Sequence, residues 1–114
     1  MRHHQHLIAM RSRGYKPVNV WLDVDATPGV VDACAELNRM AGSHHVAIEE
    51  GEAVERLDFR FLIGCTVYVH GASDRTIDRT VKAVSEFAPS RVYGMKESTL
   101  LIADSEGIRE LVYG

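Results

Sequence analysis

One stretch constrains the fold of this chain more than any other: an apolar run ends in two acids and then breaks into the start of a helix. It reads Val-Asn-Val-Trp-Leu-Asp-Val-Asp-Ala-Thr-Pro-Gly over residues 18–29. Residues 17–23 form a nearly continuous β-branched and aromatic run, which is typical of a strand covered on both faces. Thr27 is a natural N-cap, and Pro28 suits the first position of a helix. We therefore predict a central strand followed directly by a helix.

The predicted helix ends at Gly42, because glycine tolerates the positive φ common at a helix C-terminus. Its apolar positions recur at helical spacing and are expected to face the core. They are Val30, Val31, Ala33, Cys34, Leu37, Met40 and Ala41. A short strand is predicted over residues 45–49. Residues 52–63 fit both a helix and a strand, and we predict a helical turn that runs into a loop.

A second strand and helix follow in the same order. Residues 65–70 alternate like a strand, and Ser73 or Asp74 is placed to cap a helix that ends before Pro89. The apolar stripe of this helix consists of Ile77, Val81, Val84, Phe87 and Ala88. Three further strands are predicted, over residues 91–95, 99–103 and 108–113.

The order of these elements predicts the fold class. Two strand-helix-strand units, over residues 17–49 and 65–95, favour right-handed parallel crossovers with helices packed on a sheet. The short connection over residues 96–98 favours an antiparallel pair instead. We predict a single α/β domain over residues 1–114, with a mixed, mainly parallel sheet flanked by helices. A ferredoxin-like α+β sandwich is the alternative.

Composition and size favour an ordinary soluble globular domain. The chain has 114 residues, of which 46% are hydrophobic and 25% charged. Its longest apolar candidate, residues 59–69, falls short of the roughly 20 residues that a membrane span needs. The N-terminus is too brief for a secretory signal, and Cys34 and Cys65 are expected to be core residues in a reducing compartment. We therefore expect a cytoplasmic, bacterial-type protein.

Charge is distributed unevenly along the chain. Residues 1–16, which include a predicted helix over residues 2–13, form a basic arm without any acid. Its basic residues are Arg2, Arg11, Arg13 and Lys16. Because the net charge of the chain is −3, this arm of +4 leaves −7 for the rest. The arm is therefore expected either to contact the phosphate backbone of a nucleic acid or to dock on its own acidic body.

Asp23 and Asp25 stand where the predicted central strand ends. Ligands of open α/β sheets gather outside the carboxyl ends of the strands. Two carboxylates separated by one residue project from the same side of an extended backbone, and Mg²⁺ is bound through oxygen ligands. Both acids are therefore candidate catalytic and metal-binding residues. The structural alternative is that Asp25 or Thr27 caps the following helix.

This segment resembles the first motif of haloacid dehalogenase-like phosphatases, an apolar strand followed by D-x-D-x-T. The resemblance implies Asp23 as the nucleophile and Asp25 as the general acid. The run Leu-Leu-Ile-Ala-Asp-Ser at residues 100–105 is loosely similar to the late acidic strand end of these enzymes. Lys82 or Lys96 would correspond to their intervening lysine. The sequence lacks the second acid of the late motif.

The same segment also resembles the Toprim domain of primases and topoisomerases. An apolar strand, D-x-D, a glycine and an alanine-rich helix occur together there, and Asp23, Asp25, Gly29 and Ala33 lie at the corresponding positions. The catalytic glutamate of Toprim domains lies on an earlier strand, whereas no acid precedes the first strand here. Glu-Glu-Gly at residues 49–51 has the elements of that glutamate signal in the wrong order.

His70 ends the second predicted strand, shortly before a helix start. If its strand runs parallel to that of Asp23, both residues reach the same edge of the sheet. The amides after Ser73 and the helix dipole favour an anion, and Arg75 adds a charged donor. His70, Ser73 and Arg75 are thus a candidate anion site, with plain helix capping by Ser73 as the alternative. A separate metal hypothesis takes ligands from His3, His6 and either His44 or His45, with exposed titrating histidines as its alternative.

Three functions are compatible with these residues. We expect a non-enzymatic binding or interaction module without a cofactor, which self-associates through a sheet edge. Residues 99–103 and 108–112 carry little charge for edge strands and favour this function. The alternative is a Mg²⁺-dependent phosphoryl-transfer enzyme or phosphodiester hydrolase that uses Asp23 and Asp25. The third is a nucleic-acid accessory protein that uses the basic arm.

Overall fold

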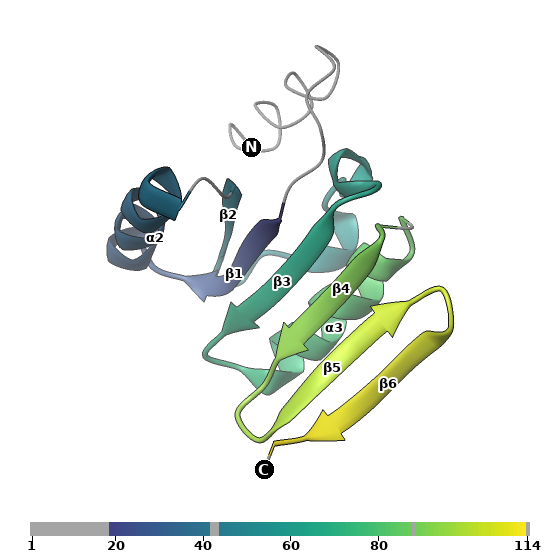
Figure 1. Ribbon diagram of the computed structural model, residues 1–114. Coiled ribbons are helices and arrows are strands. Elements are labelled where there is room, and N and C mark those ends of the chain that lie inside the picture. The colour runs from purple at the N-terminus through teal and green to yellow at the C-terminus, as the bar shows by residue number, and fades with distance from the viewer. Residues whose placement is uncertain (1–18, 42–43, 88, 114) are drawn as a thin grey trace.

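A six-stranded sheet with helices on its two faces makes up the described part of the chain (Figure 1). The computed structural model describes residues 19–41, 44–87 and 89–113, so the predicted helix over residues 2–13 lies outside the described residues. The elements, in chain order, are β1 (Val20–Ala26), α2 (Pro28–Ala41), β2 (His44–Glu49), the short 3₁₀ helices η1 (Val54–Arg56) and η2 (Arg60–Leu62), β3 (Thr66–Gly71), α3 (Asp74–Ser85), β4 (Arg91–Met95), β5 (Thr99–Asp104) and β6 (Gly107–Val112).

The sheet is mixed rather than mainly parallel, which corrects the sequence-based prediction. Its strand order is β2-β1-β3-β4-β5-β6. β1 pairs parallel with β2 and β3, and β3 pairs parallel with β4, whereas β4–β5 and β5–β6 are antiparallel. The antiparallel pairs arise because tight turns join the last three strands, whereas a parallel pair needs about a dozen residues or more. The ferredoxin-like alternative is wrong, because its split βαβ units separate the parallel strands that are neighbours here.

The two long helices lie on opposite faces of the sheet. α2 connects β1 to β2 and α3 connects β3 to β4, and these two crossovers step in opposite directions along the sheet. Because such crossovers are right-handed, the reversal of direction places the helices on opposite faces. α3 packs on β3, β4 and β5 behind the sheet in Figure 1, whereas α2 packs on β2 and β1.

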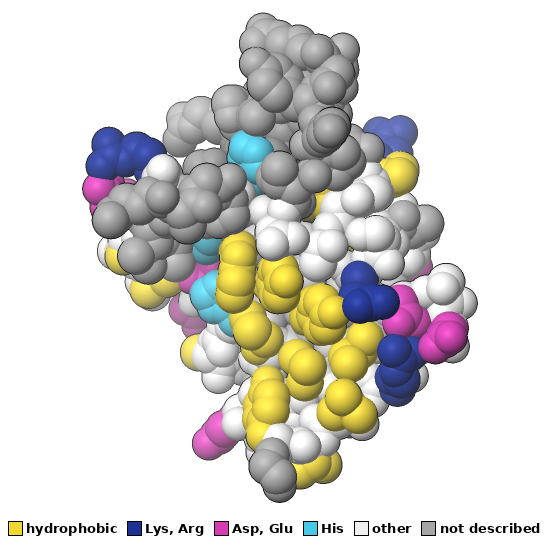
Figure 2. Space-filling model, in the orientation of Figure 1, with side chains coloured by type: hydrophobic (Ala, Val, Ile, Leu, Met, Phe, Trp, Pro, Cys, Tyr) yellow, Lys and Arg dark blue, Asp and Glu magenta, His cyan; other side chains and the backbone are white. Residues whose placement is uncertain are grey.

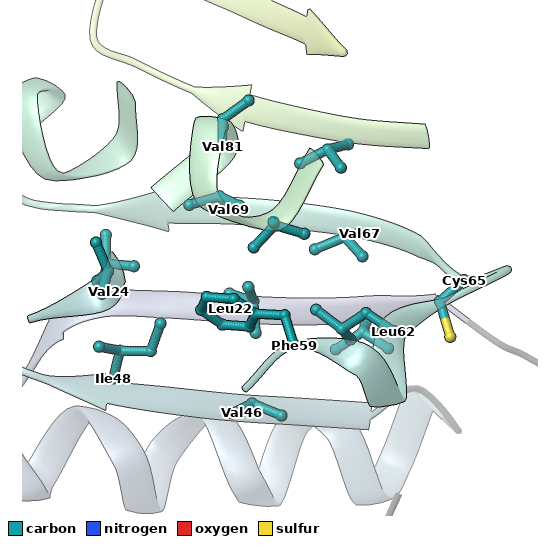
Figure 3. Packing of buried hydrophobic residues seen from close by; sticks show 14 of the residues in the cluster. Leu22, Val24, Val46, Ile48, Phe59, Leu62, Cys65, Val67, Val69 and Val81 are labelled. Atoms are coloured by element: carbon teal, nitrogen blue, oxygen red, sulfur yellow. The ribbon is translucent and has the colours of Figure 1, made fainter. Parts of the chain in front are cut away.

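The hydrophobic core fills the space between the sheet and α3 (Figure 3). Successive side chains of a strand point to opposite faces, so every second residue of β1 and β3 points to this side. The completely buried residues that meet here include Leu22 and Val24 of β1, Val67 and Val69 of β3, Val81 of α3, and Phe59 and Leu62 from the segment between β2 and β3. Burying each of these larger side chains contributes about 1.5–3 kcal/mol relative to leaving it exposed.

Both long helices begin where the sequence predicts. Pro28 is the first residue of α2, and the Ser73 hydroxyl caps α3 by accepting a hydrogen bond from the Thr76 amide at 3.4 Å. The predicted inward stripe of α3 is confirmed for Ile77, Val81 and Val84, which are buried. In α2 the predicted stripe is wrong for Val30 and Ala33, which are exposed. This helix covers only the β2 and β1 side of the sheet, so part of its apolar face meets no strand.

The described helices are short. α2 has 14 residues and α3 has 12. A membrane-spanning helix needs about 20 predominantly apolar residues. Within residues 19–41, 44–87 and 89–113, no helix is long and apolar enough to cross a membrane.

Gly71 ends β3 where this strand closely approaches β1. A Cβ placed on Gly71 would lie 2.2 Å from the Val24 carbonyl oxygen and 2.7 Å from the Val24 Cγ2. Real Cβ atoms essentially never come this close, and the carbonyl oxygen belongs to a paired strand. The contact between the two central strands therefore requires glycine at this position.

We expect Gly71→Ala to destabilise the fold by about 1–3 kcal/mol, the usual cost of forcing an extra methyl group into a packed site. Gly29→Ala is the matched control, because in the described part of the chain no atom outside its own helix backbone and its chain neighbours lies within 4 Å of a Cβ at Gly29 in α2. Urea unfolding of both variants measures the difference. Equal midpoints for the two variants would contradict this account of the β1–β3 contact.

Candidate functional site

Asp23, in the middle of β1, lies beside His70, near the carboxyl end of β3. The two strands are parallel, and their register pairs Asp23 with His70. An Asp23 Oδ1 atom lies 3.7 Å from His70 Nδ1. The Asp23 side chain is only 5% exposed, whereas that of His70 is 33% exposed. The parallel register thus places a buried carboxylate beside a partly accessible imidazole, which is an ion pair when the imidazole is protonated.

A row of aromatic rings borders this pair on the face of the sheet opposite α3, here called the open face. Trp21 stacks on Tyr68 with ring centroids 4.5 Å apart, and Tyr68 stacks on Tyr93 at 5.3 Å. His70 meets the edge of the Trp21 ring at 5.6 Å. The rings come from the neighbouring strands β1, β3 and β4, and Figure 2 shows the hydrophobic surface on this side of the molecule.

Asp25 has surroundings different from those of Asp23. It occupies the irregularity between Val24 and Ala26 in the β1–β2 ladder and has a φ of 62°. This left-handed backbone interrupts the extended alternation on which the predicted side-by-side placement of the two acids depends. The pKa of Arg79 on α3 is raised mainly by its hydrogen bonds to Glu55, and the negative charge of Asp25 adds to this shift. The charge of Asp25 therefore interacts with Arg79 of α3, whereas Asp23 lies beside His70.

Asp25 also has an unusual backbone conformation and a buried side-chain oxygen. A non-glycine residue with positive φ is uncommon, although aspartate is among the residues that tolerate it best. Its Oδ2 atom is buried and has no hydrogen-bond partner among the described residues. Sequence reasoning placed Asp25 at the strand end but missed the bulge, because a bulge depends on the pairing partner.

The three residues of the predicted anion site, His70, Ser73 and Arg75, have different surroundings. Ser73 is occupied in capping α3, as the structural alternative predicts. Arg75 is exposed in the first turn of this helix, and His70 is turned toward Asp23 on the open face. The use of His70, Ser73 and Arg75 for an anion stays a prediction.

The two metal hypotheses draw on different residues. No group of three or more His, Cys, Asp or Glu side chains that could hold a metal ion occurs among the described residues. His45 is buried in β2, and its ring centroid lies 6.5 Å from that of His70. His3 and His6 lie outside the described residues, so their predicted metal site with β2 stays a prediction. Metal binding by Asp23 and Asp25 likewise stays a prediction.

The late acid of the phosphatase resemblance lies at the wrong edge of the sheet for that motif. Asp104 ends β5, which is antiparallel to β4 and therefore to β1. The carboxyl end of β5 thus lies at the edge where the parallel strands begin, away from Asp23. Asp104 is instead paired with Arg109 in β6, at 2.9 Å. Strand direction, which the short motif does not specify, separates the two acids.

The most exposed element of the sheet is β6. All six of its residues are exposed, and they include Ile108, Leu111 and Val112, with Tyr113 following. Val112 is 78% exposed and Leu111 is 52% exposed. Among the described strands, β6 pairs only with β5 and therefore forms one edge of the sheet. The sequence correctly suggested this segment as an edge, but residues 99–103 are not one, because β5 lies between β4 and β6.

Ion pairs hold β6 in place. Lys96 bridges Glu110 of β6, at 2.7 Å, and Asp78 of α3, at 3.1 Å. The Thr99 hydroxyl donates a hydrogen bond to the same Glu110 oxygen at 2.6 Å. The Lys96 ammonium and then the Thr99 hydroxyl lower the pKa of Glu110 below its ordinary value. Both charges that β6 carries, Arg109 and Glu110, are therefore paired within the chain.

A small pocket lies between η1 and α3, on the other side of the sheet from Asp23. It has a volume of about 260 Å³ and is lined by residues that include Leu57, Phe87 and Lys82. Glu55 and Arg79 also line it and form an ion pair at 2.7 Å. The hydrogen bond from Arg79 is the main reason that the pKa of Glu55 falls to about 2. Sequence reasoning did not find this pocket, because its walls are far apart along the chain.

Comparison with known proteins does not assign the chain to a family or a fold. It matches no family model, no curated protein and no solved structure. The functional argument therefore depends on the geometry of the described residues.

If Asp23 and Asp25 hold Mg²⁺, adding Mg²⁺ or Mn²⁺ will raise the melting temperature of the wild-type chain, because a ligand that binds only the folded state stabilises it. The Asp23→Asn and Asp25→Asn variants are expected to lose this shift, and Asp32→Asn, on the exposed side of α2, is expected to keep it. Thermal unfolding with and without the metal is the measurement. A wild-type chain that shows no shift would exclude this metal site.

The lowered pKa of Glu110 predicts a pH-dependent contribution to stability. A carboxyl whose pKa falls on folding stabilises the protein above its unfolded pKa, and this contribution is lost as the pH falls through the folded pKa. We expect Glu110→Gln to lower the urea midpoint at neutral pH and to match the wild type in acid, below the ordinary glutamate range. Glu97→Gln, at an exposed position, is the control. A deficit that stays constant with pH would contradict the role of the Lys96 bridge.

Proposed function

We propose that this chain is an interaction module that self-associates through the free edge of β6. The observation that carries this proposal is the exposure of every residue of β6 on an edge that pairs with no other strand of the described chain. Unpaired backbone N–H and C=O groups of an edge strand are a template for pairing with another chain. The four large apolar side chains of residues 108–113 add surface that association would remove from water.

The usual protections of an edge strand are weak here. Natural edges are often blocked by unpaired charges, proline or bulges. Residues 107–113 contain no proline, and the β5–β6 register has no irregularity. Arg109 is paired with Asp104, and Glu110 is paired with Lys96. Because these charges already have partners, they oppose the approach of another strand less than free charges would.

The enzyme alternative is favoured by one observation, the buried Asp23 carboxylate beside His70, which lies near the carboxyl end of the parallel strand β3. This is the edge at which open α/β sheets bind ligands. The separate surroundings of Asp25 argue for a site built on Asp23 and His70 rather than on two carboxylates. The nucleic-acid alternative depends on Arg2, Arg11, Arg13 and Lys16, which lie outside the described residues, and it stays a prediction.

The backbone of β6 offers a sharp test of the proposal. The Tyr113 amide donates a hydrogen bond to the Ser98 carbonyl oxygen, so the backbone N–H of Tyr113 points to β5. Backbone groups of successive residues in a strand alternate in direction, and Val112 therefore directs its N–H to the free edge. We expect Val112→Pro to remove this donor and make the wild-type oligomer monomeric without breaking the β5–β6 ladder. Sedimentation velocity is the measurement.

Val112→Ala is the matched control, because it shortens the same side chain but keeps the N–H donor. It is expected to stay associated, with at most a modest loss of affinity. A wild-type chain that is monomeric at every concentration measured would contradict the proposed function. Equal dissociation by both substitutions would show that side-chain contacts, not pairing of the strand edge, hold the oligomer.

A further inference from the structure

We infer that the partner of β6 is the β6 strand of a second copy, paired antiparallel about a twofold axis at Leu111. This inference rests on the proposed function and specifies its geometry. In an antiparallel pair of identical strands, a twofold axis perpendicular to the sheet places one residue opposite its own copy. The same face of the sheet then continues from one copy into the other. The residue on the axis therefore fixes the register, and the short β6 strand allows few registers.

The direction of the backbone groups restricts these registers. The backbone N–H and C=O groups of Tyr113 point to β5, and those of Leu111 and Arg109 do the same. The backbone groups of Ile108, Glu110 and Val112 point to the free edge. Residues of the second group must be opposite one another across the new interface to exchange hydrogen bonds. Every register with a residue of β6 on the axis satisfies this condition. Registers with the axis between two residues do not, since they place a residue facing β5 opposite one facing the edge.

Charge selects among the remaining registers. An axis at Arg109 places two arginines opposite each other, and an axis at Glu110 does the same with two glutamates. Like charges directly opposite are destabilising in a sheet. An axis at Ile108 or at Gly107 brings Glu110 opposite an acid at the partner's β5–β6 turn, again two like charges. An axis at Val112 leaves only the end of the strand to pair.

The register with the axis at Leu111 is free of these conflicts. It places the exposed Leu111 side chain against its own copy and pairs Glu110 with the partner's Val112, through backbone groups that both face the free edge. Arg109 then lies opposite the partner's Tyr113. A guanidinium beside a tyrosine ring is a favourable cation–π pair. The interface thus joins the exposed apolar residues at the end of β6 without placing like charges opposite each other.

The position on the axis predicts a specific cross-link. Leu111 faces β5, so across the new interface it forms a non-hydrogen-bonded pair, in which opposite Cα atoms are about 4.5 Å apart. A disulfide accommodates Cα distances of about 4.4–6.8 Å. Leu111→Cys is therefore expected to give a disulfide-linked dimer on mild oxidation. The variant is made with Cys34→Ser, and Cys65 is retained because it is buried.

Arg109→Cys is the matched control on the same face of β6, and alone it is expected to remain unlinked. An equimolar mixture of Arg109→Cys and Tyr113→Cys chains is expected to form the mixed disulfide, because this register makes those positions opposite. The Cys34→Ser parent shows whether Cys65 forms any cross-link. Non-reducing gels measure the cross-linking, and the linked Leu111→Cys dimer is expected to sediment like the wild-type dimer.

The outcomes separate this inference from the proposed function. Cross-linking of Arg109→Cys but not of Leu111→Cys would overturn the register. The same holds if neither variant cross-links although Val112→Pro dissociates the wild-type oligomer, and in both cases association through β6 stands. A monomeric wild-type chain would instead overturn the proposed function and this inference with it.

Discussion

The parallel contact between β1 and β3 is the constraint on which the rest of the structure depends. Toward α3 it buries Leu22 and Val24 against the side chains of β3, and the absence of a side chain at Gly71 allows the two backbones to approach. On the open face, the same register stacks Trp21 on Tyr68 and brings Asp23 beside His70. One pairing thus creates both the core and the candidate ligand site.

The C-terminal hairpin is held in a different way. Strand β5 packs against α3 and contributes buried residues, whereas β6 is exposed along its whole length and is tied to the chain by its ladder with β5 and by ion pairs. Lys96 is central to this arrangement, because it joins β6 to α3 through two carboxylates. A strand kept in register by polar contacts at its sides leaves its outer edge available. This separation of anchoring from burial is the physical basis for the proposed association.

Much of the local structure is predictable from particular residues. Pro28 and Ser73 start their helices because proline suits a first helical turn and serine caps one. The predictions that fail concern relations between segments: Val30 is exposed because α2 covers only one side of the sheet, and β5 is an inner strand because β6 folds back beside it. The spacing of residues along the chain does not show which strands α2 covers or which strand lies beside β5.

Outside residues 52–63, the sequence by itself indicated which segments form strands and which form helices, since apolar periodicity, caps and turn residues act over a few positions. It also marked Asp23, Asp25 and His70 as residues at strand ends. Only the tertiary structure decided that Asp23 meets His70 while Asp25 sits in a bulge with its charge acting on α3. It likewise placed β6, rather than β5, at this edge of the described sheet. These outcomes depend on strand order and direction, which arise from contacts between residues far apart in the chain.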